Sequence, residues 1–496
     1  MKKLFTILIL LGVTAFGQSG TGHDPNLTLS YTPGGYSTPT KMRQASGSTA
    51  VAKNTITSAD ATDLFVNFIF DTSGKNVYIK YTINGSAPSK TNGIEVTCGS
   101  VYYSDPNRTW KGTIPSLSPG LEIKYVFYIS NSDVASAWGR VAANGYLTTW
   151  TEGDSYFSFR NRHVTTGSGG DWNTATTWDK STIPSASTDE VELNHSVTLD
   201  GDEQVSLLQI NLGGTFNGGS NNLTISPNGS IVNNGTFTAS TGKVSFTGAT
   251  TLTGTIGFNN VDLGGGVNFG SASTINGLLQ INAGGFCNTN GPFYADGSTL
   301  QYNIDYSLST EWYASAASGQ GVPYNVVING GNVYFANTAF VYRQIRNDLT
   351  INASKIFALS ETAGGDLRIG GDFINNGTFT ANGRSVLFNG SAAQDISGSG
   401  TGDFAYVDIN NGNGVTLSRN ITIGNQLKLS NGNLTLGINS VSLGSSSLLN
   451  SGGLGSVSDF SNTNMVITNG TGTLNRTVAA SAIVFPIGYS ATYYNP

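Results

Sequence analysis

The chain has 496 residues with a formal net charge of −6, and only 11% of the residues are charged. So mild a charge supplies neither the basic patch that nucleic acid requires nor a polybasic membrane signal, which excludes nucleic acid as a partner. Glycine contributes 65 residues, and the plentiful aromatic and β-branched residues exclude a disordered chain, so the composition is typical of extracellular β-proteins built from short strands and tight turns.

Residues 1–17 have the three parts of a secretory signal peptide. Lys2 and Lys3 form the basic part, Leu4–Val13 the apolar part, and Ala15–Gly17 the cleavage site. The apolar run is shorter than the roughly 20 residues of a membrane span, which favours a signal peptide over a membrane anchor. No other apolar stretch approaches that length. We therefore expect a mature chain without a transmembrane segment, secreted or held on the cell surface at the outer face of the outer membrane.

Residues 18–162 are predicted to form an antiparallel β-sandwich. Leu64–Phe70, Val77–Ile83 and Leu121–Ile129 have the composition of strands, and turn signals such as Asn84–Gly85 separate them. The strict alternation of the last two predicts that one face packs on a core and the other faces solvent. Several strands at this spacing are typical of a sandwich.

The segment Tyr81–Ser89 resembles the Y-T-x-D/N-G-S-x-P-S turn of immunoglobulin-like and fibronectin-like modules attached to carbohydrate-active and surface proteins. Aromatic residues of this region supply ring faces for stacking on sugars or for packing in the core. Tyr102, Tyr103 and Trp138 lie in turn-rich segments rather than in clean strands. They are therefore the candidate carbohydrate-binding residues, with core packing as the alternative.

Residues 163–200 are predicted to be a linker followed by the cap of a solenoid. A Gly/Ser run at 167–170 precedes Trp172 and Trp178, and a strand-like stretch ends at Val197–Asp200. This pattern resembles the first segment of right-handed β-helices in large secreted proteins of Bacteroidetes-type bacteria, and it is similar to the glycine-rich module called G8. Two tryptophans can cover the open apolar end of a solenoid, which would otherwise promote aggregation.

Residues 201–496 contain an internal repeat and are predicted to form a right-handed parallel β-helix. Asn233–Ala239 recurs as Asn375–Ala381, and the apolar residues that follow keep the same offset. At roughly 20–25 residues per coil, the region gives about 13 coils in a rod of about 60 Å. We expect Phe237 and Phe379 to point inward at equivalent positions, and turn pairs such as Asn221–Asn222 to stack as amide ladders. A chain of β-sandwiches is the alternative.

This repetitive stretch resembles the β-helix region of surface proteins exported by type IX secretion. The likeness lies in Asn375–Gly390, in the segment from Tyr302 through Trp312 to Ile328, and in Gly472–Gly488. In such proteins a C-terminal sorting domain directs export across the outer membrane. The present chain ends on the aromatic run Tyr493–Pro496, so we expect a β-helix that is truncated at its C-terminus.

Right-handed β-helices also host polysaccharide lyases and hydrolases, whose sites need clustered carboxylates or a Lys/Arg base beside a metal-binding acid. Between residues 205 and 345 the only charged side chains are Lys243, Asp262, Asp296, Asp305, Glu311 and Arg343. Asp305 and Glu311 lie close in sequence beside Trp312, where a retaining glycosidase pair is conceivable. The favoured interpretation is a solvated loop whose aromatic residue packs on the solenoid wall. We therefore predict no catalytic residues.

No metal or cofactor is predicted. Cys98 and Cys287 fall in different predicted domains and are expected to be free or buried thiols, and no Cys/His spacing suits a metal. The acidic segments Asp200–Glu203 and Asp366 leave calcium binding as an alternative to plain surface turns. Nothing places a base near a nucleophile, so structural roles are expected for His23, His163 and His195.

These observations predict an exported, non-enzymatic surface or secreted protein that is adhesin-like or a structural stalk. Its expected partner is a polysaccharide or a host or matrix surface. A carbohydrate-binding module on a β-helix spacer is the first alternative, and a β-helix polysaccharide lyase or hydrolase is the second. Retardation by soluble polysaccharides discriminates the first alternative, and turnover of polysaccharides discriminates the second.

Overall fold

A computed structural model of the chain shows an all-β protein. The structure describes residues 42–45, 62–67, 74–83, 86–100, 109–115, 122–130, 139–142, 145–147, 156–160, 162–179, 181–313, 316, 318–335, 342–362, 364–444, 448–450, 460–477, 485–490 and 492–494. Within these ranges the helical elements are the short 3-10 turns η2 (Ala175–Thr177) and η3 (Thr310–Trp312). None of the described helices is long and apolar enough to cross a membrane. The predicted signal peptide lies outside these ranges.

Contacts divide the chain into two compact units, residues 1–169 with 174–192, and residues 170–173 with 193–496. The first unit contains two antiparallel sheets, ordered β1-β2-β6-β5 and β4-β3-β7-β8-β9, with β10 paired to β7. Their strands are β1 (Met42–Ala45), β2 (Thr62–Asn67), β3 (Asn76–Thr82), β4 (Ile94–Thr97), β5 (Gly99–Ser100), β6 (Thr109–Ile114), β7 (Glu122–Ser130), β8 (Gly139–Ala142), β9 (Gly145–Leu147) and β10 (Phe157–Arg160).

The two sheets approach each other at Gly112 of β6. A Cβ atom on this residue would lie 2.3 Å from the Cδ1 atom of Ile79 in β3, so only glycine fits there without a shift. Such an approach is what a sandwich requires. The complete sandwich stays a prediction.

The expectation that one face of β7 lies in solvent is wrong. Tyr125–Ile129 are all fully buried. Val126 and Tyr128 form a cluster with Tyr78 of β3, and Tyr156 packs against that cluster. The alternation along β7 therefore separates two buried faces of the strand. Tyrosine fits such a face because its ring packs as an apolar group while its hydroxyl group stays polar.

Both tryptophans of the predicted cap are buried. The ring of Trp172 packs edge-on against Phe216, with 6.4 Å between centroids. The ring of Trp178 packs edge-on against His163 at 6.3 Å. His163 belongs to β11 (His163–Val164), which pairs in parallel with β13 (Glu190–Leu193). This histidine therefore lies in a buried strand, and Trp178 contributes to its surroundings.

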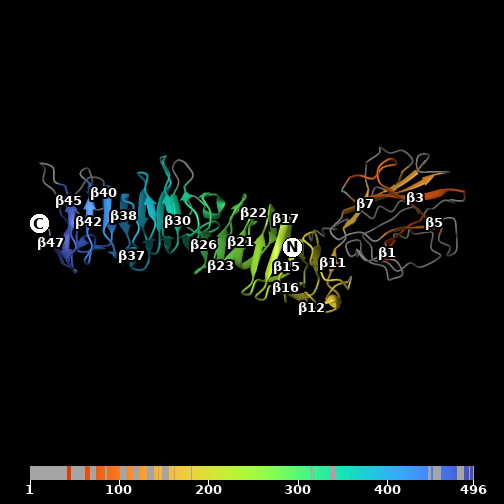
Figure 1. Ribbon diagram of the computed structural model, residues 1–496, viewed down its shortest axis with the longest axis horizontal. Helices are drawn as coiled ribbons and strands as arrows, with labels where there is room; N and C mark the ends of the chain where they lie inside the picture. The colour runs from red at the N-terminus through yellow and green to blue at the C-terminus, as the bar shows by residue number, and fades with distance from the viewer. Residues whose placement is uncertain are drawn as a thin grey trace, which may run out of the picture. The chain divides into compact units, whose positions relative to one another are not determined.

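The second unit is a parallel β-solenoid of about 13 turns. Figure 1 shows its strands stacked in chain order from β15 to β47. The long sheet contains β14 (Ser196–Thr198), β15 (Glu203–Ile210), β16 (Thr215–Asn217), β17 (Asn222–Asn233), β18 (Thr236–Thr238), β19 (Lys243–Phe246), β20 (Thr250–Gly254), β21 (Ile256–Leu263), β22 (Gly266–Asn268), β23 (Ser273–Ile281), β24 (Phe286–Cys287), β25 (Phe293–Tyr294), β26 (Thr299–Tyr302), β28 (Asn325–Ile328), β31 (Leu349–Ile351), β34 (Phe373–Asn375), β37 (Gln394–Ser397), β39 (Val415–Leu417), β41 (Leu434–Thr435), β44 (Val466–Ile467), β46 (Ile487–Tyr489) and β47 (Thr492–Tyr494).

Two further sheets complete the wall of the solenoid. The short sheet has the order β27-β29-β32-β35, with β27 (Tyr306–Ser307), β29 (Val333–Tyr334), β32 (Ile356–Ala358) and β35 (Thr378–Thr380). The third sheet contains β30 (Tyr342–Ile345), β33 (Asp366–Ile369), β36 (Ser385–Phe388), β38 (Phe404–Asn410), β40 (Ile421–Asn431), β42 (Val441–Leu443), β43 (Leu448–Asn450) and β45 (Leu474–Arg476). β46 and β47 form an antiparallel pair.

The core of the solenoid is built from register positions that stay apolar from coil to coil. One such position in the long sheet is buried in nine successive coils, because an inward side chain is covered by its equivalents on both sides. It is occupied in turn by Leu223, Val244, Val261, Leu279, Leu300, Val326, Leu349, Phe373 and Ile396.

The internal repeat corresponds to a repeated turn. Asn233 donates from Nδ2 to the carbonyl of Thr255 at 2.6 Å, and its Oδ1 atom accepts from the Gly235 N–H at 3.1 Å. Asn375 does the same with the carbonyl of Thr401 at 2.8 Å and the Gly377 N–H at 3.0 Å. In both copies the asparagine closes its own turn and ties it to the next coil.

Phe379 points inward, as predicted. Phe237 also faces the interior, because it shares a register row with buried Phe216 and its neighbours Thr236 and Thr238 are exposed, but its burial is incomplete. Phe379 is 2% exposed and contacts three other phenylalanine rings, whereas Phe237 is only half-buried. Phe237 stacks between Phe216 and Phe258, at 5.0 and 5.4 Å between centroids. The flanking rings enclose Phe237 along the solenoid axis, but no phenylalanine equivalent to Phe373 closes its remaining side.

Candidate functional site

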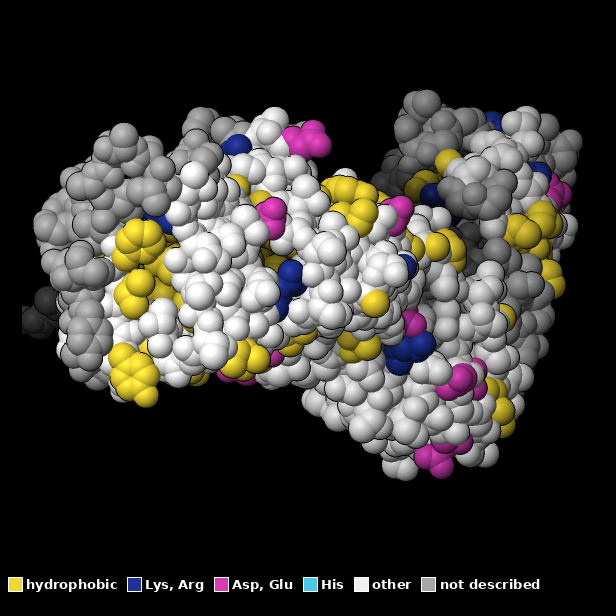
Figure 2. Space-filling model, turned by 60° about the vertical axis from the view of Figure 1, so that its left-hand side comes forward, with side chains coloured by type: hydrophobic (Ala, Val, Ile, Leu, Met, Phe, Trp, Pro, Cys, Tyr) yellow, Lys and Arg dark blue, Asp and Glu magenta, His cyan; other side chains and the backbone are white. Residues whose placement is uncertain are grey.

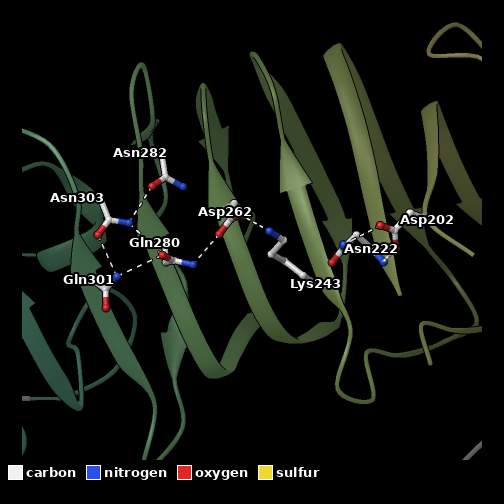
Figure 3. Close-up of polar contacts among 8 residues, drawn as sticks. All are labelled: Asp202, Asn222, Lys243, Asp262, Gln280, Asn282, Gln301 and Asn303. Carbon is white, nitrogen blue, oxygen red and sulfur yellow. Dashed lines mark hydrogen bonds and ion pairs between the residues drawn. The ribbon is translucent and has the colours of Figure 1, made fainter. Parts of the chain in front are cut away.

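The predicted carbohydrate-binding residues Tyr102, Tyr103 and Trp138 lie outside the described residues. The described surface of the solenoid does carry an organised group of polar side chains. Figure 3 shows six of them, on or directly after neighbouring strands of the long sheet: Lys243, Asp262, Gln280, Asn282, Gln301 and Asn303. We call this group the polar ladder; its members are Lys243, Asp262, Gln280, Asn282, Gln301, Asn303, Asn329 and Asn352.

The ladder begins with an ion pair. Lys243 of β19 places Nζ 2.6 Å from Oδ2 of Asp262 in β21. Gln280 of β23 donates to the other oxygen of Asp262 at 2.9 Å, and Gln301 of β26 donates to Oε1 of Gln280 at 3.2 Å. Asp262, Gln280 and Gln301 occupy one register position, so parallel pairing without a shift brings them into contact.

The ladder continues through asparagines that follow the strands. Asn303 donates to Asn282 at 2.8 Å, Asn329 donates to Asn303 at 2.9 Å, and Asn352 donates to Asn329 at 2.7 Å. Asn303 also donates to Gln280 at 3.0 Å, which joins the two rows. Amide ladders were predicted at turn pairs such as Asn221–Asn222 instead. In the structure Asn221 donates to the Leu199 carbonyl and Asn222 donates to Asp202, so these two asparagines bond to other groups.

The direction of donation along the ladder has an electrostatic cause. A carboxylate can only accept, so Asp262 fixes Gln280 as its donor. The Gln280 carbonyl oxygen then faces the next coil and accepts from Gln301 and Asn303. Between coils the amides of Gln280, Gln301, Asn303, Asn329 and Asn352 thus donate toward the start of the chain, and neighbouring dipoles reinforce one another. The ladder therefore ties successive coils together on the outside of the sheet, as the apolar column does inside.

The acidic turn before the ladder also serves coil-to-coil bonding. Asp202 accepts from the backbone N–H of Asn222 at 2.8 Å and from its side chain at 3.0 Å, and these bonds lower the pKa of Asp202. Asp200 accepts in the same way from Asn173. Among the described residues no cluster of three or more His, Cys, Asp or Glu side chains could hold a metal ion.

The solvated-loop interpretation is wrong for Glu311. This residue, in η3, is 0% exposed. Its Oε1 atom accepts from the Ser309 N–H at 2.8 Å and from the Tyr302 hydroxyl at 3.2 Å, and its Oε2 atom accepts from the Tyr306 hydroxyl at 3.2 Å. Burial raises the pKa of Glu311, although these bonds and the charge of Arg343 act in the opposite direction.

The neighbouring Trp312 explains why the segment that contains Glu311 folds inward. Its ring is fully buried and packs against Phe335 and Phe357, at 5.6 and 6.0 Å between centroids. Its Nε1 atom donates to the carbonyl of Gln344 at 3.0 Å, and its own carbonyl accepts from Arg343 at 3.0 Å. Docking of this ring carries the adjacent carboxyl group into the interior.

Asp305 and Glu311 do not form an exposed pair. Asp305 is exposed and accepts from the Asn332 N–H at 2.7 Å, whereas Glu311 faces the buried tyrosines. Cys98 and Cys287 are both free and buried, as expected. Burial raises the pKa of both thiols.

The face of the molecule in Figure 2 is mostly uncharged, and its acidic and basic side chains are scattered rather than gathered. No protein-family model, no curated protein and no solved structure matches this chain.

Proposed function

We propose that the chain is an exported, non-enzymatic surface or secreted protein that acts as an adhesin-like or structural stalk. In this proposal residues 1–17 direct export, the solenoid is right-handed, and the N-terminal strands form an immunoglobulin-like sandwich. The protein resides outside the cell, at the outer face of the outer membrane or released from it. Its partner is a polysaccharide or a host or matrix surface.

The observation that supports a stalk is the continuity of bonding between coils. Parallel strand pairing links the solenoid strands, apolar columns fill the inside, and the polar ladder adds side-chain bonds outside. Since each coil contacts chiefly its neighbours, such bonding resists bending and pulling along the whole array. A surface protein that spaces a binding region away from the cell requires this mechanical property.

Two experiments test the proposal. The purified full chain is incubated with pectins, glycosaminoglycans and glucans, and new reducing ends and unsaturated sugars are measured; sustained turnover of any of them contradicts the non-enzymatic role. Separately, residues 1–17 are fused to a periplasmic reporter in a Gram-negative host, with a fusion lacking Leu4–Val13 as control. Equal retention of both fusions inside the cell contradicts export.

A further inference from the structure

A groove lies on the outer face of the short sheet. One register row crosses this sheet, with Ser307 beside Tyr334, Tyr334 beside Ala358, and Ala358 beside Thr380. The residues before them in the same strands, Val333, Phe357 and Phe379, are buried in the core. Since neighbouring residues of a strand point to opposite faces, the row itself faces outward.

The groove exists because the side chains along this row differ abruptly in size. Ala358 is small and stands between the ring of Tyr334 and the side chain of Thr380, so a hollow forms over it. Glu361 and Asn382, from the turns after β32 and β35, complete the lining together with Phe335, Ile356 and Leu359. The hollow has a volume of about 490 Å³, within the range of about 300–1,000 Å³ that is usual for ligand pockets.

Three hydroxyl groups and one amide oxygen of the groove are available to a ligand. The side chains of Ser307, Tyr334 and Thr380 make no hydrogen bond within the described parts of the chain. Asn382 uses Nδ2 to bond the Leu359 carbonyl at 2.7 Å, and its Oδ1 atom accepts no hydrogen bond within the described parts of the chain. Tyr334 is 41% exposed. An exposed ring among hydroxyl and amide groups matches a molecule with both C–H faces and hydroxyl groups.

We propose that this groove binds an uncharged saccharide chain, with Tyr334 as the stacking platform. The proposal deepens the adhesin-like role and rests on that role for binding without turnover. The negative charge of Glu361, at the edge of the groove, repels acidic sugars. A peptide strand cannot add here by backbone pairing, because β29 and β32 are already paired on both sides within the short sheet.

The test uses the full chain in affinity gels that contain dextran, a β-glucan, a galactomannan or a xylan, with polygalacturonate as the acidic comparison. We expect at least one neutral polysaccharide to retard the protein. Tyr334→Ala is expected to weaken that binding roughly tenfold, because truncating a central aromatic contact typically costs at least that factor. Tyr406→Ala is the matched control, since Tyr406 is a 37% exposed tyrosine on β38 of the third sheet.

Three outcomes overturn the inference: no retardation by any neutral polysaccharide, equal retardation of Tyr334→Ala and the unmodified chain, or stronger retardation by polygalacturonate than by every neutral polymer. Thermal unfolding of both variants confirms that neither substitution disturbs the fold. Retardation that is insensitive to Tyr334→Ala rejects the groove but leaves the adhesin-like role intact. Cleavage of the retarding polymer, in contrast, rejects the non-enzymatic role.

Discussion

Substitution of Phe379 by alanine should destabilise the solenoid strongly but locally. The ring is 2% exposed, and its centroid lies 6.2 Å from that of Phe357, 5.2 Å from Phe373 and 5.4 Å from Phe404. Removing a buried phenylalanine side chain forfeits about 1.5–3 kcal/mol of apolar burial. The cavity left among three rings raises the expected loss in free energy of unfolding to about 3–5 kcal/mol.

Hydrogen exchange followed by mass spectrometry measures both the size and the extent of this effect. Because coils are coupled chiefly to their neighbours, protection should fall in peptides within residues 350–420 and stay unchanged within residues 200–260. Phe237→Ala is the matched control, and its half-buried ring should cost about 1–2 kcal/mol. Equal losses in the two variants, or loss of protection in both regions after Phe379→Ala, would refute this reasoning.

Three further substitutions test the interior, the ladder and the turns. Burial raises the folded-state pKa of Glu311, so the contribution of this carboxyl group to stability is present at acidic pH and is lost as pH rises through the raised pKa. Glu311→Gln should therefore flatten the dependence of the melting temperature on pH. Parallel curves of melting temperature against pH for the two proteins would contradict this. Asn303→Ala breaks ladder bonds on both sides and should lower the free energy of unfolding, measured by urea titration, by about 1–2 kcal/mol. Asn352→Ala, at the end of the ladder, should lower it less, and the reverse order would argue against a connected ladder. Gly254 has φ +90°, and a Cβ atom on this residue would lie 1.9 Å from the Asn233 carbonyl oxygen. Gly254→Ala should therefore lower the free energy of unfolding by about 1–3 kcal/mol, as measured by thermal unfolding. An unchanged melting temperature would exclude this backbone strain.

The polar ladder and the groove show what a single sequence leaves undetermined about sites. Asp262, Gln280 and Gln301 each occupy an outward position of a short strand, which is ordinary for polar residues. Their contact depends on which residues share a register across coils whose connecting loops differ in length. Aligning the coils on their inward Val, Ile and Leu residues would have placed these three in one row, so a signal existed. The groove depends in addition on the loops that contribute Glu361 and Asn382.

The sequence by itself determined the features that arise from local pattern. Alternation within strands, Asn and Gly turns and the internal repeat predicted an all-β chain with a parallel solenoid, and the length of that region predicted about 13 coils. In the structure the repeat of Asn233 at Asn375 is a repeated turn. The burial of Glu311 and the incomplete burial of Phe237 were decided by the tertiary structure. A charged residue beside a tryptophan is usually exposed, because burying a carboxyl group is costly without partners. Only the folded solenoid brings Tyr302, Tyr306 and the Ser309 N–H together around that carboxyl group and so compensates for the loss of water.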